Sequence, residues 1–362
     1  MSTPQAASTP ILAQTPVTAP AVSPSPRTAA DVLDQCREAC SATLHAAVQM
    51  MPATVRTIVG YHFGWWDPTG RPEKHDGGKA IRPALVLSAA RLTGGDVAAA
   101  VRAAVAVELV HNFSLLHDDV MDRDTTRRHR PTAWTAFGIG PAILAGDALV
   151  AQAYSLLAAE PNTPIVEATN LMSRSVLHLV EGQCADLGFE RRTDVEVDEC
   201  LTMVDQKTGA LFGCSAALGG LFGNADSGEL LHLQEFGRRL GRAFQHTDDL
   251  LGIWGDPHVT GKSVFSDLRS RKKSLPVVFA LRSNTPEAGA LADLYLREKP
   301  LDDSELVHAA ELIEAAGGRE WSRLQARQLY EEAMSAISQV GSDAEALADL
   351  DLLAALAADR DC

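Results

Sequence analysis

The sequence contains six cysteines but no CxxC pair. Cys36 and Cys40 are four residues apart, a spacing that places both on one face of a helix. Cysteines without a pairing pattern are expected as free thiols, and free thiols persist in a reducing compartment. We therefore expect a cytoplasmic protein without disulfides.

Basic residues are also scarce. The 362 residues include 32 Lys and Arg against 47 Asp and Glu, so the formal net charge is −15. Nucleic acids bind to basic stripes on a protein surface, and these counts do not supply one. The composition argues against a nucleic-acid partner, and any anionic ligand has to be met by a local group of cations.

Residues 1–30 lack both the basic start and the uninterrupted apolar stretch of a signal peptide or membrane anchor. They are rich in Pro, Ala, Ser and Thr, a composition that buries too little apolar surface to offset chain entropy. We expect a disordered tail and no membrane span. Two interpretations stay open: a passive solubilising tail, or an address that a partner protein recognises.

Period-two alternation, the mark of half-buried strands, is almost absent from residues 31–362. Apolar residues recur instead at three- and four-residue spacing, as in "DVAAAVRAAVAVELVHNFSLLHDDV". Loop-like breaks such as "RDTTRRHRPT" and "GDPHVTGKS" separate these segments. With 46% hydrophobic residues and neither linker nor repeat, residues 31–362 are predicted to form one all-α domain, a bundle of long helices.

Four aspartates stand where one predicted helix ends, in "SLLHDDVMDRDTTRRHRPT", and the first three form a DDxxD pattern. Asp118 and Asp122 are four residues apart on that helix, with Asp119 beside them, so their carboxylates repel one another. The helix dipole makes anions less favourable there, by about 0.3–1 kcal/mol each. Oxygen ligands without His or Cys suit a hard cation such as Mg²⁺, completed by water and phosphate oxygens. Taken alone, the cluster fits a solvated acidic helix end equally well.

A second acidic group follows in "FQHTDDLLGIWGD", where Asp248 and Asp249 end an apolar stretch and Asp256 lies in the loop beyond. Two such groups on separate helices can face each other across a cavity and hold several divalent ions around one polyanion. The next segment, "GDPHVTGKSVFSDLRSRKKSLP", adds Lys262 and Lys272 as donors for phosphate.

Further polar donors are grouped near these motifs, namely Lys79, Arg82, Arg127, Arg128, Lys207 and Thr208. Lys79 and Arg82 flank the start of a helix in "DGGKAIRPALVL", where backbone N–H groups favour an anion. Any one such cation is most often a solvated surface charge. An acidic protein that keeps its cations beside two aspartate groups nevertheless indicates a bound polyanion.

The motifs, in this order, resemble those of the polyprenyl synthetase family, the trans-isoprenyl diphosphate synthases. The likeness runs from about residue 50 to about residue 340 and is strongest to geranylgeranyl diphosphate synthases of actinobacterial type. Five or more ordered motifs are specific, whereas a single DDxxD is not. The matching motifs are GGKxxRP at Gly77–Pro83, DDxxD at Asp118–Asp122 with the Arg pair after it, GQxxDL at Gly182–Leu187, KT at Lys207, FQxxDD at Phe244–Asp249 and GK at Gly261.

The resemblance implies a role for each matching residue. Asp118, Asp122 and Asp248 would hold three Mg²⁺ ions around an allylic diphosphate, with Asp119 and Asp249 supporting them. The groups that hold the same diphosphate would be Arg127, Lys207, Gln245 and Lys262, and Thr208 and Lys272 are predicted to bind substrate as well. A second pocket, for isopentenyl diphosphate, would consist of Lys79, Arg82, His111 and Arg128.

One position departs from the family pattern. The second acidic motif reads DDLLG, with Gly252 where many relatives have a third aspartate, and Asp256 follows in the loop. In the family that third carboxylate is the least directly engaged with metal, so we expect activity to survive the change. The role of Asp256 stays open.

The reaction implied by the resemblance is a head-to-tail condensation of isopentenyl diphosphate with an allylic diphosphate. It needs no protein nucleophile, in keeping with a site of Asp, Lys and Arg. Phe113 and Ser114, about one helical turn before Asp118, adjoin the place where the product chain would grow. The family pattern there implies a C20 product, with C15 next, although Phe113 fits ordinary core packing equally well.

Two other functions share part of the pattern. A class I terpene cyclase has the helical fold and DDxxD, but it carries an Asn/Ser/Glu metal triad in place of a second aspartate motif and does not need GGKxxRP. A non-catalytic subunit that binds prenyl diphosphates would be expected to lose ligand positions, which are intact here. The resemblance also implies a homodimer, and relatives with long Pro/Ala-rich N-termini suggest that residues 1–30 load the protein into an encapsulin-type shell.

Overall fold

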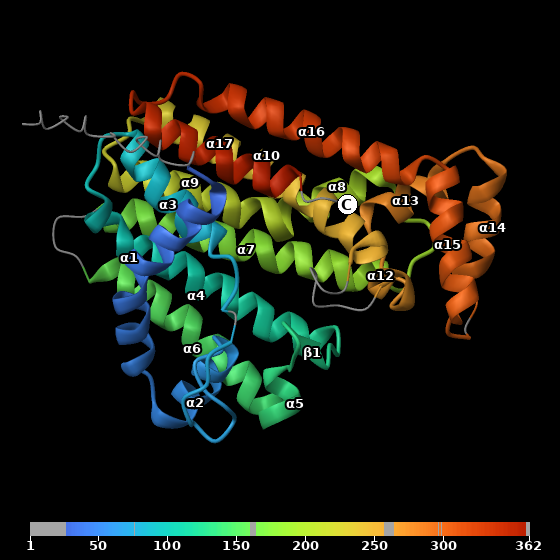
Figure 1. Ribbon diagram of the computed structural model, residues 1–362, viewed down its shortest axis with the longest axis horizontal. Coiled ribbons are helices and arrows are strands. Elements are labelled where there is room, and N and C mark those ends of the chain that lie inside the picture. The colour runs from blue at the N-terminus through green and yellow to red at the C-terminus, as the bar shows by residue number, and fades with distance from the viewer. Residues whose placement is uncertain are drawn as a thin grey trace, which may run out of the picture.

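The computed structural model describes residues 27–75, 77–159, 164–256, 264–295, 297 and 299–359. These residues are almost entirely helical (Figure 1), which confirms the predicted all-α fold. In chain order the elements are α1 (Ala29–Gln49), α2 (Ala53–His62), α3 (Ile81–Leu92), α4 (Val97–Met121), β1 (Thr126–Arg127), β2 (Arg130–Pro131), α5 (Ala133–Phe137), α6 (Ile139–Ala158), α7 (Ile165–Phe189), α8 (Val197–Val204), the π-helical turn η1 (Asp205–Gly209), α9 (Ala210–Phe222), α10 (Ser227–Trp254), α12 (Ser266–Arg269), α13 (Leu275–Arg282), α14 (Pro286–Tyr295), α15 (Asp303–Ala315), α16 (Gly318–Ile337) and α17 (Ala344–Ala358).

Helices α3, α4, α9 and α10 form the centre of the bundle. Nearly every residue of α9 is buried, as expected of a helix that is apolar on all sides. α10 packs against α9 and α16, and α4 packs against α3 and α6. Fully buried side chains such as Phe212 and Phe236 belong to the main apolar core, where each stabilises the fold by about 1.5–3 kcal/mol.

A second apolar cluster lies beside one end of this bundle. The end of α10 contributes Ile253 to it, and α13, α14 and α15 contribute residues such as Leu291 and Leu306. Figure 1 shows α14 and α15 at that end, and the short helix α12 contacts both α10 and α15. This packing fixes α12 against the last turns of α10.

Capping residues fix the start of the two helices that carry the acidic motifs. The side chain of Asp96 accepts from the Ala98 amide at the start of α4. Asp226 and Glu229 form a capping box at the start of α10. Each cap stabilises its helix by about 1 kcal/mol. Both helices then run unbroken, so each acidic motif stands at a C-terminal helix end, as predicted.

The described chain begins with an ion pair to the last helix. Arg27 Nε lies 2.5 Å from Asp349 Oδ1 of α17, and Arg91 Nη1 lies 3.7 Å from the other oxygen of Asp349. Thr28 and Asp31 form a capping box, so α1 begins at Ala29, slightly before the predicted domain boundary at residue 31. Residues 1–26, most of the predicted tail, lie outside the described residues.

Two of the described helices, α4 and α6, are long and apolar enough to cross a membrane by length and composition alone. Most of α4 is buried inside the bundle, so its apolar character is that of a core helix. α6 is less covered and exposes Ile139, Ile143 and Leu144.

The cysteines Cys36, Cys40, Cys184, Cys200 and Cys214 are free thiols, as predicted, and Cys362 lies outside the described residues.

Candidate active site

A tight hairpin carries the arginine pair that follows the first acidic motif. β1 pairs antiparallel with β2, with Arg127 opposite Arg130. The two loop residues, Arg128 and His129, both have positive φ values, 50° and 60°, which suit the twist of a two-residue hairpin. Left-handed backbone at residues other than Gly costs about 1–3 kcal/mol each and is typical of functional sites. A segment predicted as a plain loop is thus a shaped turn.

This hairpin is anchored to the end of α4 by Asp119. Arg127 donates from Nε to Asp119 Oδ1 at 2.7 Å, and its Nη2 is equally close. The Asp119 side chain is 1% exposed, and its other oxygen, Oδ2, has no hydrogen-bond partner among the described residues. Burial raises the pKa of Asp119, and the charge of Arg127 opposes that rise. Asp119 therefore orients Arg127.

Lys207 stands among the carboxylates of two helices. Its Nζ donates to Asp186 Oδ2 of α7 at 2.6 Å. Burial alone would lower the pKa of Lys207, but the charges of Asp118 and Asp186 outweigh it and raise the pKa. Burial raises the pKa of Asp122 to about 6, and the neighbouring Asp118 and Asp186 add to the effect of burial. One ammonium group thus serves several crowded carboxylates.

The backbone around Lys207 is a π-helical turn, η1, between α8 and α9. Such turns insert an extra residue into a helix and occur often at functional sites. Gly182 of α7 packs directly on the Lys207 backbone, where a Cβ atom would overlap it. The first glycine of the GQxxDL motif therefore lets α7 approach η1.

The second acidic motif divides into one exposed and one buried carboxylate. Asp248 is exposed at the end of α10. Asp249 is buried and accepts from Leu275 N at 2.9 Å, Gln245 Nε2 at 2.8 Å and Lys272 Nζ at 3.5 Å. Burial nonetheless raises the pKa of Asp249, although Lys272 lowers it. Asp249 thus connects α10 to the start of α13, while Asp248 lies exposed on the preceding position of α10.

Thr208 extends the same network. Its Oγ1 donates to Gln245 Oε1 at 2.8 Å, while the Gln245 amide donates to Asp249. Because both functional groups of Gln245 are engaged, this side chain is held in one orientation between η1 and α10.

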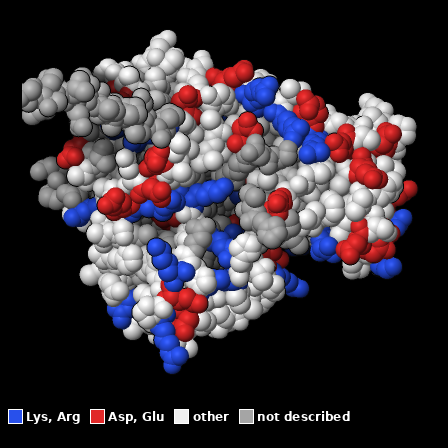
Figure 2. All heavy atoms as spheres, viewed as in Figure 1, with Lys and Arg blue, Asp and Glu red and all other residues white. Residues whose placement is uncertain are grey.

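The first acidic motif borders a hollow of about 490 Å³ through Asp122, and Asp249 of the second motif contacts Lys272, which also lines it. It is lined by Asp122, Arg123, Asp124, Thr125, Thr126, Asp186, Glu190, Lys207, Ser266, Asp267, Arg269, Ser270, Lys272 and Lys273. Lys272 interacts with both motifs: burial raises the pKa of Asp118 and the charge of Lys272 opposes that rise, while Asp249 and Asp248 raise the pKa of Lys272 against its burial. Lys272 thus interacts electrostatically with both helix ends, and Figure 2 shows basic side chains around a recess near the middle of the face in view.

A second group of cations lies beside the glycine-rich turn. Arg128 Nη1 donates to Gly77 O at 2.7 Å, and its guanidinium covers Gly78, whose φ is +102°. A Cβ atom at Gly78 would lie 2.5 Å from Arg128 Nη2. A side chain at residue 78 would strain the left-handed backbone and would overlap the Arg128 guanidinium, so glycine is the residue that suits this position.

Arg82 and His111 complete this basic group from α3 and α4. The Arg82 side chain is buried, with its guanidinium 4.5 Å above the centre of the Phe212 ring. Burial lowers the pKa of His111 well below its usual value, and Arg82 and Arg128 lower it further. A neutral imidazole beside buried guanidinium groups is an environment that favours an anion.

The comparisons with known proteins identify the family. The polyprenyl synthetase model matches residues 73–313, which is more than half of the chain. The chain belongs to the polyprenyl synthetase family. It is 44% identical over 332 residues to a (2E,6E)-farnesyl diphosphate synthase of Mycobacterium tuberculosis, covering 91% of this chain and 92% of the relative. It is also 44% identical to a geranylgeranyl diphosphate synthase of that species, covering 91% and 94%.

Solved structures of this polyprenyl synthetase family have the same architecture. A polyprenyl synthetase from Streptomyces coelicolor A3(2) superimposes with a TM-score of 0.87 at 43% identity, covering 91% of this chain and 99% of that one. A geranylgeranyl pyrophosphate synthetase from Pyrococcus horikoshii Ot3 superimposes with a TM-score of 0.81 at 31% identity, covering 92% and 98%. The predicted family is therefore confirmed.

The structure brings together most residues that the sequence predicts for this polyprenyl synthetase site. The hollow and the contacts around it include Asp118, Asp119, Asp122, Arg127, Lys207, Thr208, Gln245, Asp248, Asp249 and Lys272. The neighbouring basic group consists of Lys79, Arg82, His111 and Arg128. Lys262 lies outside the described residues. Asp256 follows the end of α10 and is exposed. Phe113 and Ser114 lie further back along α4, where Phe113 packs against the main core.

Four carboxylates that line the hollow were not predicted as site residues, namely Asp124, Asp186, Glu190 and Asp267. Asp186 belongs to the GQxxDL motif, so the motif itself is the signal that points to it. Asp267 lies in a polar stretch with several other charged residues, and nothing local in the sequence distinguishes it.

The donor set of the hollow suits magnesium held jointly with a substrate. Among the described residues no three His, Cys, Asp or Glu side chains converge closely enough to hold a metal ion by themselves. The carboxylates that face the hollow, Asp122 and Asp186 among them, offer oxygen only. Mg²⁺ prefers this combination of one or two carboxylates with water and phosphate oxygens. The residues therefore fit an ion that completes its shell from a diphosphate.

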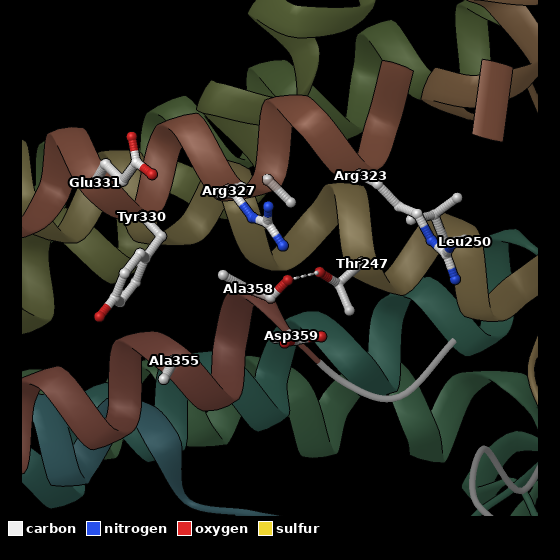
Figure 3. Close-up of a pocket in the computed structure, with 10 residues that line it drawn as sticks. Thr247, Leu250, Arg323, Arg327, Tyr330, Glu331, Ala355, Ala358 and Asp359 are labelled. Atoms are coloured by element: carbon white, nitrogen blue, oxygen red, sulfur yellow. Dashed lines mark hydrogen bonds between the residues drawn. The ribbon is translucent and has the colours of Figure 1, made fainter. Parts of the chain in front are cut away.

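A larger hollow of about 770 Å³ lies between α10, α16 and α17 (Figure 3) and shares no lining residue with the site. Arg323 and Arg327 of α16 point into it, and Thr247 Oγ1 donates to Ala358 O at 3.1 Å. This bond connects the end of α17 to α10 at the residue before Asp248.

Proposed function

We propose that this trans-prenyltransferase condenses isopentenyl diphosphate with an allylic diphosphate in a Mg²⁺-dependent, head-to-tail reaction that releases diphosphate. One observation carries the proposal: the hollow beside Asp122 is lined by Lys207, which Asp118 of the first acidic motif stabilises, and by Lys272, which contacts Asp249 of the second. A site so charged is stable when divalent cations and a polyanion complete it.

The allylic diphosphate is proposed to occupy the hollow that Asp122, Lys207 and Lys272 line. Asp118, Asp122 and Asp248 would hold the cations, three of them by analogy with the family. Bound Mg²⁺ supplies Lewis-acid stabilisation of the charge that develops on the leaving diphosphate. The donors that hold the diphosphate oxygens are Arg127, Lys207, Lys262 and Lys272, with Thr208 and Gln245 fixing the wall beside them.

Isopentenyl diphosphate occupies the neighbouring basic group. Lys79, Arg82 and Arg128 neutralise its diphosphate, and His111, neutral because of burial, donates or accepts without adding charge. This basic group differs chemically from the acidic hollow. Its cations surround a glycine-rich backbone segment, so it can bind a diphosphate without a metal ion.

The chain's own residues provide orientation and electrostatic stabilisation. The allylic C–O bond breaks with its electron pair going to the diphosphate, which Arg127 and Lys207 hold. The double bond of isopentenyl diphosphate, held by Arg82 and Arg128 close to the allylic carbon, forms the new C–C bond. The proton lost from the isopentenyl unit goes to the departing diphosphate. No side chain is alkylated at any step.

The product is a short-chain prenyl diphosphate, C20 favoured and C15 next. The named relatives at 44% identity make one product of each kind, so identity alone does not choose between them. Phe113 stands against the His117 ring with ring centroids 4.8 Å apart, on the turn of α4 before Asp118. An aromatic ring there supports a limit on product length.

The protein is proposed to act as a cytoplasmic homodimer. α6 exposes Ile139, Ile143 and Leu144, and its neighbour α7 exposes Leu177 and Val180. A second copy of the chain would cover these apolar side chains.

The single domain is proposed to carry a separate tail that serves as the encapsulin-type loading segment. Because Arg27 pairs with Asp349 and Thr28 caps α1, a truncation should remove only residues 1–26. Turnover should then stay intact while co-purification with a co-expressed shell is lost. Continued co-purification would contradict the loading role.

The two other functions are less well supported. A terpene cyclase has no use for the basic group around Gly77 and Arg128, which here is built with strained backbone. A non-catalytic subunit is disfavoured because the carboxylates and lysines of the hollow are all present.

The test is a product assay with purified protein, Mg²⁺ and radiolabelled isopentenyl diphosphate, supplied in turn with C5, C10 and C15 allylic primers. Products are dephosphorylated and sized by chromatography. Chain elongation that requires Mg²⁺ and is abolished in Asp118→Asn supports the proposal. Conversion of an allylic diphosphate to hydrocarbons without isopentenyl diphosphate would support a cyclase, and no conversion would support the non-catalytic subunit.

A further inference from the structure

Gly252 lies in the last turns of α10, at the position of the missing third aspartate of the second acidic motif. Its φ is not in the left-handed range, so the backbone does not require glycine there. Glycine inside a helix destabilises the helix by about 1 kcal/mol relative to alanine. A glycine at this position therefore indicates that close packing leaves no room for a side chain. The space beside Gly252 is occupied.

The carboxylate of Asp267 occupies the volume that a side chain at residue 252 would fill. A Cβ atom built on Gly252 would lie 2.5 Å from Asp267 Cγ and 2.5 and 2.6 Å from its two oxygens. Residues three and four positions apart share one face of a helix, so a side chain at 252 would lie beside Asp248 and Asp249. Asp267 therefore reaches, from another helix, the place of the absent carboxylate.

Asp267 is held in this position by its own short helix, α12. Ser266 Oγ donates to Gly252 O at 3.3 Å and lies 3.3 Å from Asp267 Oδ1. Lys272 N donates to Asp267 O at 2.9 Å, which closes the turn after α12. Asp267 is 8% exposed, yet it lines the same hollow as Asp122 and Lys272.

The charge arrangement around Asp267 is that of a site residue. Lys272 Nζ lies 3.5 Å from Asp249 Oδ1 and 4.0 Å from Asp267 Oδ2, so it bridges the second acidic motif and Asp267. Asp122, Asp186 and Lys207 line the same hollow. A nearly buried carboxylate that is matched by one shared ammonium group leaves oxygen lone pairs available to a cation or its water ligands.

We propose that Asp267 supplies the third carboxylate of the second acidic motif in place of residue 252, and that it orients Lys272 and the water ligands of a cation bound at Asp248. This inference rests on the proposed function, because it assigns Asp267 to the same cation and diphosphate site. It also gives Gly252 a role: the glycine admits the carboxylate of another helix. Asp256 is not needed for this role.

The test measures Mn²⁺ binding in the presence of inorganic diphosphate, by electron paramagnetic resonance, without turnover. Asp267→Asn keeps the packing against Gly252 and removes the charge, so it should weaken Mn²⁺ binding about tenfold. Asp303→Asn is the matched control, because Asp303 is an exposed aspartate that pairs with Arg269 of the same short helix. The control should bind Mn²⁺ as the unchanged protein does.

A carboxylate swap distinguishes the position from the charge alone. Asp267→Ala should lose affinity, and Gly252→Asp combined with Asp267→Ala should recover most of it, since the carboxylate then comes from α10. Gly252→Asp alone should be less stable to urea, because two carboxylates would compete for one volume.

Unchanged Mn²⁺ binding in Asp267→Asn would overturn the proposal, as would a double variant that binds no better than Asp267→Ala. The product assay separately tests the proposed function. An unchanged protein that makes no prenyl product but binds Mn²⁺ in an Asp267-dependent manner would refute the reaction and keep the site residue.

Discussion

The ammonium group of Lys207 donates a 2.6 Å hydrogen bond to Asp186, a carboxylate on a different helix. The same ammonium group is stabilised by Asp118 of the first acidic motif. Lys207 therefore neutralises carboxylates that otherwise repel one another across the hollow.

Replacing Lys207 by glutamine should destabilise the metal-free protein. Asp186 and Asp118 would lose their shared cation, and a partly buried charge left without its partner costs roughly 2–4 kcal/mol. Urea unfolding in the presence of a chelator measures this change. Lys299→Gln, at an exposed lysine, is the control. Equal midpoints for the two variants would contradict the shared-cation role.

Replacing Gly78 by alanine should selectively weaken isopentenyl diphosphate binding. The added methyl group would displace the Arg128 guanidinium, so the KM for isopentenyl diphosphate should rise about tenfold while the KM for the allylic substrate stays unchanged. Gly70→Ala introduces similar backbone strain, with φ +84° and open space around it. An equal effect in both variants would show that strain alone is responsible.

Replacing Phe113 by alanine should lengthen the product by at least one isoprene unit. The ring stands one turn behind Asp118, and its removal opens space along α4. Chromatography of the dephosphorylated products measures chain length. Phe279→Ala, in which a ring stacked on Trp321 is lost elsewhere, should leave chain length unchanged. Identical products from Phe113→Ala and the unchanged enzyme would refute the limit.

Acidification should destabilise the fold through buried histidine. Burial lowers the pKa of His246 to about 3, whereas the unfolded chain has a value near 6.5. Between these values only the unfolded state binds the proton, so this contribution is complete above about pH 6.5 and is lost as the pH falls toward 3.

The expected slope of the unfolding free energy is up to about 1.4 kcal/mol per pH unit for this group. Urea unfolding between about pH 7 and about pH 5 should give a flatter dependence for His246→Asn than for the exposed control His308→Asn. Parallel curves would contradict the assignment to His246.

Replacing Leu144 by glutamate should dissociate the proposed dimer. Leu144 is 62% exposed on α6, and a charge in an apolar interface would oppose association. Light scattering after size exclusion gives the mass. Leu324→Glu, on α16 and 54% exposed, is the control. A dimer that survives Leu144→Glu would exclude this part of α6 as the interface.

The helical fold and both acidic motifs could be predicted from the sequence because their signals are local. The spacing of Asp118 and Asp122 is a property of one helix, and the apolar period of α4 extends over its whole length. The grouping of cations near the motifs could likewise be predicted from the order of the motifs.

The features that were not predicted depend on the path of the chain in three dimensions. The meeting of Gly252 with Asp267 requires the packing of α12 on α10, which no local pattern encodes. The hairpin that directs Arg128 toward Gly77 resembles an ordinary loop in the sequence. The π-helical turn at Lys207 has helical segments on both sides, so its extra residue cannot be recognised from the spacing of apolar residues in the sequence.

The Arg27–Asp349 ion pair connects the beginning of the described chain to α17, away from α12 and β1 in the view of Figure 1. Cargo, tags or a surface attached through residues 1–26 would therefore be anchored on the flank of the bundle where α17 lies. An immobilised or encapsulated enzyme should then keep the hollow beside α12 unobstructed, so this N-terminal side suits engineered fusions.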